Sequence, residues 1–167
     1  MIIQSKMFLQ RLCECFLKEF INYIFSQIRN ESSMALIDWK NEYSINNKII
    51  DEQHKKLVDF INQLHGAMGA GKGKDILGNI LDELVSYTVF HFSSEEKFMK
   101  DHNYSGYSLH KIEHDKLTKQ VVEFQNNYKT GKSVVSQELL KFLKDWLVNH
   151  IIGSDKKLAK LSADNAL

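Results

Sequence analysis

Four stretches of the chain place apolar or histidine residues at alternating spacings of three and four, the pattern of a helix with one buried face. These stretches lie within residues 50–64, 77–98, 110–128 and 139–150. The chain contains no proline, so long helices can run without interruption. Because short connections between long helices make neighbours antiparallel, the sequence predicts an all-α, up-down-up-down four-helix bundle.

The connections between these stretches carry residues that end or begin helices. A glycine-rich segment at 69–73, the polar residues 101–106 and Gly131 are expected to end the first three helices. Asp75 and Ser133 are candidates to cap the starts of the second and fourth helices.

Length and charge indicate a single globular domain that does not bind nucleic acid. A chain of 167 residues fits one ordinary domain with its own core. Its 22 Lys and Arg nearly balance its 21 Asp and Glu, and no dense basic run is present, so we expect no nucleic-acid partner. Cys13 and Cys15 are too few for a zinc site and weakly indicate a reducing compartment, consistent with a cytoplasmic protein.

Residues 1–33 differ from the rest of the chain, because apolar side chains crowd this short segment. Lys18 and Glu19 interrupt the apolar run, which disfavours both a secretory signal and a membrane-spanning helix. Three interpretations stay open: an amphipathic helix at a membrane surface or partner, an extra helix packed on the bundle, or upstream sequence before a true start at Met34. We therefore predict an N-terminal extension, residues 1–33, followed by a bundle domain, residues 34–167.

Ionisable residues occupy positions of the helical faces that should be apolar. Burying such a group without a partner costs several kcal/mol, so these side chains must be satisfied by one another or by a metal. Residues four apart project from the same face of a helix and can bind a common ion. Two such pairs occur among the six inward positions, which are His54, His91, Glu95, His110, His114 and His150.

Asp155 extends the set, although it lies five residues after His150 and would point about 140° away on an ideal helix. The two side chains can share a site if the site is extended or the helix is distorted, and Gly153 between them permits a distortion. Five imidazoles and two carboxylates exceed what one ion accepts, which predicts two metals. Imidazole suits iron, copper or zinc, and bridging carboxylates in a helical bundle favour iron.

The motifs that carry these residues resemble those of bacterial hemerythrins. They are DEQHKKL at 51–57, HFSSEE at 91–96, HKIEH at 110–114 and WLVNHIIGSD at 146–155. The resemblance implies that His110, His114 and His150 hold one iron and that His54 and His91 hold the other. It also implies that Glu95 and Asp155 bridge both irons together with an oxo or hydroxo group. One position would then stay open on the iron of His54 and His91, where dioxygen would bind reversibly.

The resemblance also leads to expectations about the oxygen pocket, alternative functions and partners. Trp146 and Leu147, one turn before His150, are candidates to line a dry oxygen pocket. The main alternative is a di-iron oxidase or peroxidase-type enzyme, although such sites carry more carboxylates than this one. A sensor would need an output domain, and only residues 155–167 follow the site. We expect a monomeric oxygen-binding protein rather than an enzyme, with an oxygen-consuming enzyme as one conceivable recipient.

Overall fold

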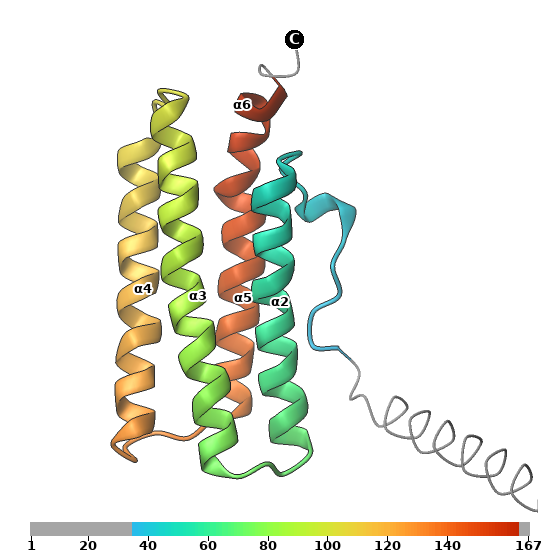
Figure 1. The fold of residues 1–167 in the computed structure, drawn as a ribbon, viewed down its shortest axis with the longest axis vertical. Coiled ribbons are helices and arrows are strands. Elements are labelled where there is room, and N and C mark those ends of the chain that lie inside the picture. The colour runs from blue at the N-terminus through green and yellow to red at the C-terminus, as the bar shows by residue number, and fades with distance from the viewer. Residues whose placement is uncertain (1–34, 164–167) are drawn as a thin grey trace, which may run out of the picture. The chain divides into compact units, whose positions relative to one another are not determined.

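Four long antiparallel helices make up most of the protein (Figure 1), in a computed structural model that describes residues 35–163. They are α2 (Lys48–Gly69), α3 (Lys74–Asp101), α4 (Tyr107–Lys129) and α5 (Gln137–Gly153). Shorter helical elements are η1 (Asn41–Tyr43), η2 (Asp155–Leu158) and α6 (Ala159–Ala163). The predicted four-helix bundle is confirmed, whereas the prediction of an extra helical segment in residues 1–33 falls outside the described residues.

The helices alternate in direction along the chain (Figure 1). Helix α3 packs against α2 and α4, and α2 also packs against α5. This order brings residues from the start of α2, the end of α3, the start of α4 and the end of α5 to the same end of the bundle. The six inward ionisable residues lie in these four places.

Three of the helices end with a residue at positive φ, which turns the chain sharply. These residues are Gly71 after α2 (φ 63°), Asn103 after α3 (φ 49°) and Gly131 after α4 (φ 73°). At Gly131, the N–H of Lys132 donates to the carbonyl of Asn127 at 2.8 Å, satisfying a carbonyl that the helix leaves free.

The two predicted caps are wrong. Gly73 precedes helix α3 and provides no side-chain cap. Asp75 lies inside the first turn, where its carboxylate interacts favourably with the positive end of the helix dipole. Helix α5 begins three residues later than expected, so Ser136 and not Ser133 accepts the hydrogen bond from the N–H of Leu139. Asn47, which accepts from Ile49 and Ile50, caps α2.

Two apolar clusters lie on either side of the ionisable residues. The larger fills the end of the bundle near the α2–α3 and α4–α5 connections and includes Leu64, Leu81 and Leu140, all at most 1% exposed. The smaller comprises Ile45, Ile50, Met99 and Leu158. On α2, His54 lies between Ile50 of the small cluster and Leu57 of the large one, so the polar residues are enclosed along the bundle axis.

Residues 35–47 run beside α2 toward the polar end of the bundle (Figure 1). The backbone of Ile37 exchanges two hydrogen bonds with the Asn62 side chain, at 3.0 and 2.9 Å. Asp51 accepts from the Ser44 hydroxyl and the Ile45 N–H, at 2.6 and 2.8 Å. These contacts fix the segment so that the Trp39 ring stacks on that of His54, with centroids 6.5 Å apart.

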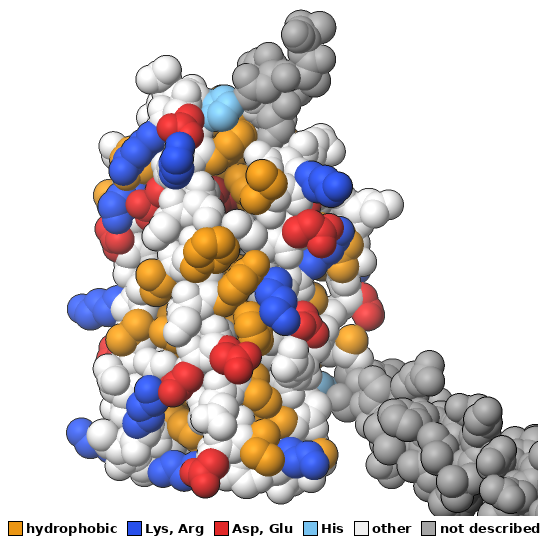
Figure 2. Space-filling view, in the orientation of Figure 1, with side chains coloured by type: hydrophobic (Ala, Val, Ile, Leu, Met, Phe, Trp, Pro, Cys, Tyr) orange, Lys and Arg blue, Asp and Glu red, His pale blue; other side chains and the backbone are white. Residues whose placement is uncertain are grey.

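Charges of both signs are interspersed with apolar side chains on the face shown in Figure 2. Within residues 35–163, every helix is too short or too polar to cross a membrane.

Candidate metal centre

All seven residues predicted to form the site are buried at the polar end of the bundle. The exposed fraction is 0% for His54, Glu95 and Asp155 and 7% for His150, the most exposed of the seven. Groups of this kind lose water on folding and must recover its interactions elsewhere. Their contacts therefore decide what the site can bind.

Three histidines converge on one point from α4 and α5. The Nε2 atom of His150 lies 3.2 Å from Nε2 of His110 and 3.1 Å from Nε2 of His114. Ligand atoms at neighbouring corners of an octahedron lie about 3.0 Å apart when metal–nitrogen bonds are about 2.1 Å long. Both measured spacings are therefore close to those of neighbouring corners of an octahedral site.

The remaining two histidines, from α2 and α3, form a second group. The rings of His54 and His91 are 4.7 Å apart between centroids, and Nε2 of His54 lies 3.2 Å from Oδ2 of Asp155. Glu95 and Asp155 belong to both groups, since the ligand atoms within each group lie within 4.8 Å of one another. The arrangement is two overlapping clusters that share both carboxylates.

The two carboxylates contact the histidines in different ways. Asp155 presents Oδ1 to His110 and His150, at 3.0 and 3.1 Å, and Oδ2 to His54. Glu95 Oε2 lies 3.2 Å from Nε2 of His114 and 3.6 Å from that of His110. A carboxylate that uses its two oxygens toward two histidine groups has the placement of a bridging ligand.

A change in helix type brings Asp155 to the site. Helix α5 ends at Gly153, Ser154 adopts φ −110° and ψ −55°, and the chain continues as the 3-10 helix η2 from Asp155. This departure from ideal α-helix lets side chains five residues apart face the same centre. The helix is therefore distorted near Gly153, which is one of the two conditions expected to let His150 and Asp155 share a site.

Several atoms of the cluster have no hydrogen bond even though polar neighbours are close. Both nitrogens of His54 and all four carboxylate oxygens of Glu95 and Asp155 are buried without a hydrogen-bond partner. Elsewhere in the described residues, only His65, Ser133 and Trp146 have such an atom. Buried polar atoms are nearly always paired, so the residues fit a bound cation that accepts these lone pairs.

Burial and neighbouring charges shift the pKa values in the cluster. Burial lowers the pKa of His91 well below its usual value and, together with His150 and His110, lowers that of His114 to about 4. Burial, followed by the charge of Asp155, raises the pKa of Glu95 to about 8. Burial also opposes ionisation of Asp155, but His150, His110 and His54 outweigh it and hold its pKa well below the usual range.

These shifts describe a metal-free cluster in which some histidines are neutral and one carboxyl retains its proton at neutral pH. Neutral imidazole is the form that binds a metal, so His91 and His114 are ready ligands. A cation would replace the proton of Glu95, because metal ligands bind in their deprotonated form.

The chain matches the family model of the hemerythrin HHE cation binding domain over residues 46–161. The chain belongs to the hemerythrin family. It is 40% identical over 124 residues to bacteriohemerythrin of Methylococcus capsulatus, covering 74% of this chain and 94% of that protein. Bacteriohemerythrin of Pseudomonas aeruginosa is 36% identical over 122 residues, covering 73% and 78%. A crystal structure of wild-type hemerythrin has a TM-score of 0.72 at 38% identity, covering 75% of this chain and 97% of that chain.

Three candidate ligand histidines have partners that the sequence analysis did not identify. Nδ1 of His91 lies 3.1 Å from Oε1 of Gln53, and Nδ1 of His114 lies 3.3 Å from Oε1 of Glu96. Nδ1 of His150 lies 3.2 Å from Oε2 of Glu113. The available signal was that each of these residues directly adjoins a site residue in sequence, namely His54, Glu95 or His114.

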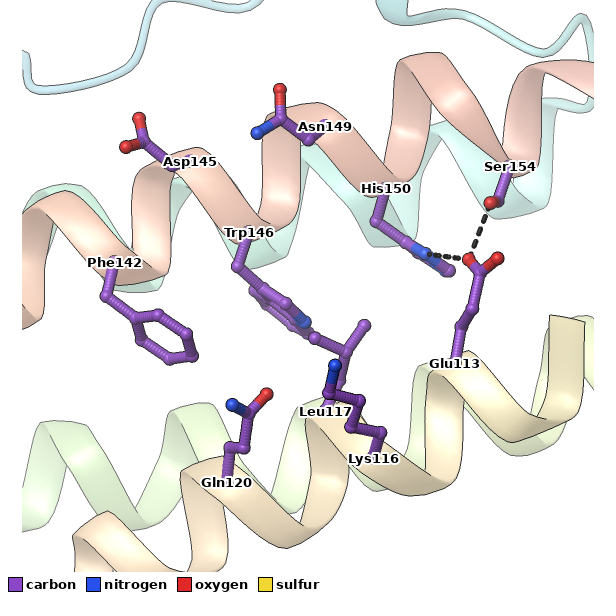
Figure 3. A pocket seen from close by; sticks show the side chains of 10 residues that line it. All are labelled: Glu113, Lys116, Leu117, Gln120, Phe142, Asp145, Trp146, Asn149, His150 and Ser154. Carbon is purple, nitrogen blue, oxygen red and sulfur yellow. Dashed lines mark hydrogen bonds and ion pairs between the residues drawn. The ribbon is translucent and has the colours of Figure 1, made fainter.

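Both predicted pocket residues belong to the large apolar cluster, Leu147 at 2% and Trp146 at 7% exposed. Trp146 lies edge-on to Phe92 at 6.1 Å, and Phe92 stacks on His114 with centroids 3.8 Å apart. Trp146 also lines a groove of about 510 Å³ between α4 and α5 that reaches His150 (Figure 3). Their role at an oxygen pocket stays a prediction.

Proposed function

We propose that this protein binds dioxygen reversibly at a non-haem di-iron centre. The observation that carries the proposal is the pair of overlapping ligand groups, one with three histidines and one with two, that share Glu95 and Asp155. Membership of the hemerythrin family, with relatives named bacteriohemerythrin, supports it independently.

The proposed ligands leave the two iron positions unequal. His110, His114 and His150 with two carboxylate oxygens and a bridging oxo or hydroxo group would complete six ligands. His54 and His91 with the same shared groups would give five. The side of His54 and His91 would therefore have fewer ligands, and dioxygen is the further ligand proposed for it.

Two ferrous ions held by these residues would supply the electrons that reversible binding of dioxygen requires. The chain contributes neutral imidazoles, two shared carboxylates and an enclosure that excludes water. The enclosure includes the Phe92 ring against His114 and the Trp39 ring against His54. We include Trp146 and Leu147 among the residues that keep the oxygen pocket dry. Exclusion of water limits proton leakage to bound oxygen and so favours its release unchanged.

A di-iron oxidase or peroxidase is the alternative function for such a centre. Ferritin-like carboxylate proteins use a Glu from each of two helices and a Glu-x-x-His motif from each of the other two. The cluster here has five imidazoles for two carboxylates. Fewer anionic ligands stabilise high-valent iron less well, which favours a carrier over an enzyme.

The biological use that we propose for bound oxygen is storage, delivery to an oxygen-consuming enzyme, or sensing, in the cytoplasm. These uses share one site and differ in affinity and partner.

The test is to load the purified protein with iron, reduce it without oxygen, and record visible spectra through repeated exposure to air and deoxygenation. We expect two irons per chain and a charge-transfer band that appears with oxygen and disappears without it. Irreversible bleaching with oxidised product would instead indicate the enzyme.

A pair of histidine variants makes this test specific. His110→Ala removes a proposed ligand and should abolish the band, whereas His65→Ala changes a histidine outside both ligand groups and should leave it unchanged. Loss of the band in both variants would contradict the assigned site.

A further inference from the structure

The two halves of the proposed centre differ in the groups that lie next to the outer nitrogens, Nδ1, of their histidines. On the three-histidine side, carboxylates approach the outer nitrogens of His114 and His150. On the two-histidine side, His91 faces the neutral amide of Gln53, and Nδ1 of His54 has no hydrogen-bond partner. Negative charge is therefore supplied to one half only.

Glu113 is the outer carboxylate behind His150. Its Oε2 lies 3.2 Å from Nδ1 of His150 and accepts a hydrogen bond from the Ser154 hydroxyl at 2.5 Å (Figure 3). Ser154 directly precedes Asp155, so the same short segment orients a proposed bridging ligand and the carboxylate behind His150. The charge of Glu96, by contrast, is shared with Lys111, whose Nζ lies 3.7 Å from its Oε2.

A carboxylate that accepts the outer N–H of a ligand histidine has two effects. It fixes the tautomer and the plane of the ring, and it makes the inner nitrogen a stronger donor to the metal. Removal of such an outer partner typically lowers metal affinity about 10- to 100-fold. Oε2 of Glu113, 3.2 Å from the outer nitrogen of His150, is close enough to supply this effect there, whereas Nδ1 of His54 has no hydrogen-bond partner.

We propose that Glu113 is a positioning residue that makes the three-histidine position the tighter of the two and the first to fill with metal. This inference rests on the proposed di-iron centre and adds an order of loading to it. The groove of about 510 Å³ in front of Glu113 leaves its side chain 47% exposed, so a substitution there can be accommodated without repacking the core.

Stepwise binding of Zn²⁺ to the metal-free protein tests the inference, since zinc accepts imidazole and carboxylate ligands and has no redox chemistry. Affinities are measured by competition with a chromophoric chelator. Two variants are compared with the wild type: Glu113→Gln keeps the size and an acceptor oxygen but removes the charge, and Glu113→Ala removes both. Glu123→Gln makes the same charge change at an exposed position on the same helix, ten residues away, as a control.

We expect the wild type to bind two Zn²⁺ ions in steps of unequal affinity. Glu113→Gln should weaken the tighter step about 10-fold, and Glu113→Ala should weaken it by up to about 100-fold. The weaker step, the helical content and the Glu123→Gln control should stay unchanged. A role in folding alone would change the helical content instead of one binding step.

Two results separate the inference from the function on which it rests. If the wild type binds two ions and Glu113→Gln binds both as tightly, the inference is overturned and the centre stands. If the wild type fails to bind two ions at all, the proposed centre fails first, and the inference fails with it.

Discussion

The two ends of the bundle are buried to the same degree but filled with opposite chemistry. At one end Leu64, Leu81 and Leu140 are at most 1% exposed, and at the other His54, Glu95 and Asp155 are 0% exposed. Burial of a leucine side chain stabilises a fold by about 2 kcal/mol, whereas burial of an unpaired charge opposes folding. The comparison teaches that the apolar end supplies the stability, whereas the polar end opposes folding unless its side chains pair with one another or with a cation.

The largest expected effect comes from removing a ligand that both groups share. Asp155→Asn should lower the affinity of both metal-binding steps by more than about 100-fold, because loss of an outer partner alone costs up to that factor. Chelator competition measures the affinities. The matched control is Asp145→Asn, the same change at a carboxylate on α5 that pairs with Lys141 outside both ligand groups. Equal loss in the control would show that charge, not ligation, is responsible.

A cavity at the apolar end should separate stability from ligation. Leu84, 1% exposed, lies in the large apolar cluster, and Leu84→Ala should lower the free energy of unfolding by about 2–5 kcal/mol. Denaturant unfolding measures the change, with Ile76→Ala at a 48% exposed position of α3 as the control. Metal stoichiometry should stay at that of the wild type, and its loss would show that the two ends are not independent.

The raised pKa of Glu95 predicts that this residue lowers the free energy of unfolding of the metal-free protein at neutral pH. Its pKa is about 8 when folded, against 4.5 for an ordinary Glu, so between these values the unfolded chain binds fewer protons. This group therefore lowers the free energy of unfolding as pH rises from 4.5 toward 8. Glu95→Gln should remove this dependence and stabilise the metal-free protein by on the order of 3 kcal/mol at pH 7.

The thermal stability of the wild type and of Glu95→Gln is measured after chelator treatment, between pH 5 and pH 8 in steps of ~1 pH unit. The same variant should bind metal more weakly, so the stability gain and the binding loss have opposite signs. A stability that falls equally with pH in both proteins would contradict the assignment to Glu95.

The smallest expected effect concerns the cover over the two-histidine side. Trp39 stacks on His54 and is held there by the segment that Asp51 and Asn62 anchor. Trp39→Ala should speed decay of the oxygenated spectrum severalfold, because water reaches the site more easily. Trp39→Phe keeps an aromatic ring and should restore most of the wild-type decay time. If all three proteins decay at one rate, this side is not protected by the segment.

Much of the fold, and the convergence of the seven candidate ligands, could be predicted because helical spacing is a local property. His91 and Glu95, or His110 and His114, share a face by spacing alone, and four such faces in antiparallel helices must meet at one end. Spacing also indicated that His150 and Asp155 could share a site only if the site is extended or the helix is distorted, because Asp155 otherwise points away from His150.

The features that were missed depend on positions that spacing does not determine. Helix α5 begins at Gln137 because the chain stays extended past Ser133, which moved the cap to Ser136. The contacts of Glu113 and Glu96 cross between helices and depend on how each side chain turns at the surface of its own helix. Without knowledge of the neighbouring helix, Glu113 resembles any other exposed carboxylate.

The central claim is that seven side chains enclose two irons at the polar end of the bundle, and anomalous X-ray scattering from crystals of the iron-loaded protein tests it most directly. The account predicts two iron peaks, one among His110, His114 and His150 and one beside His54 and His91, each in contact with Glu95 and Asp155. A single peak, or none within reach of these carboxylates, would contradict it.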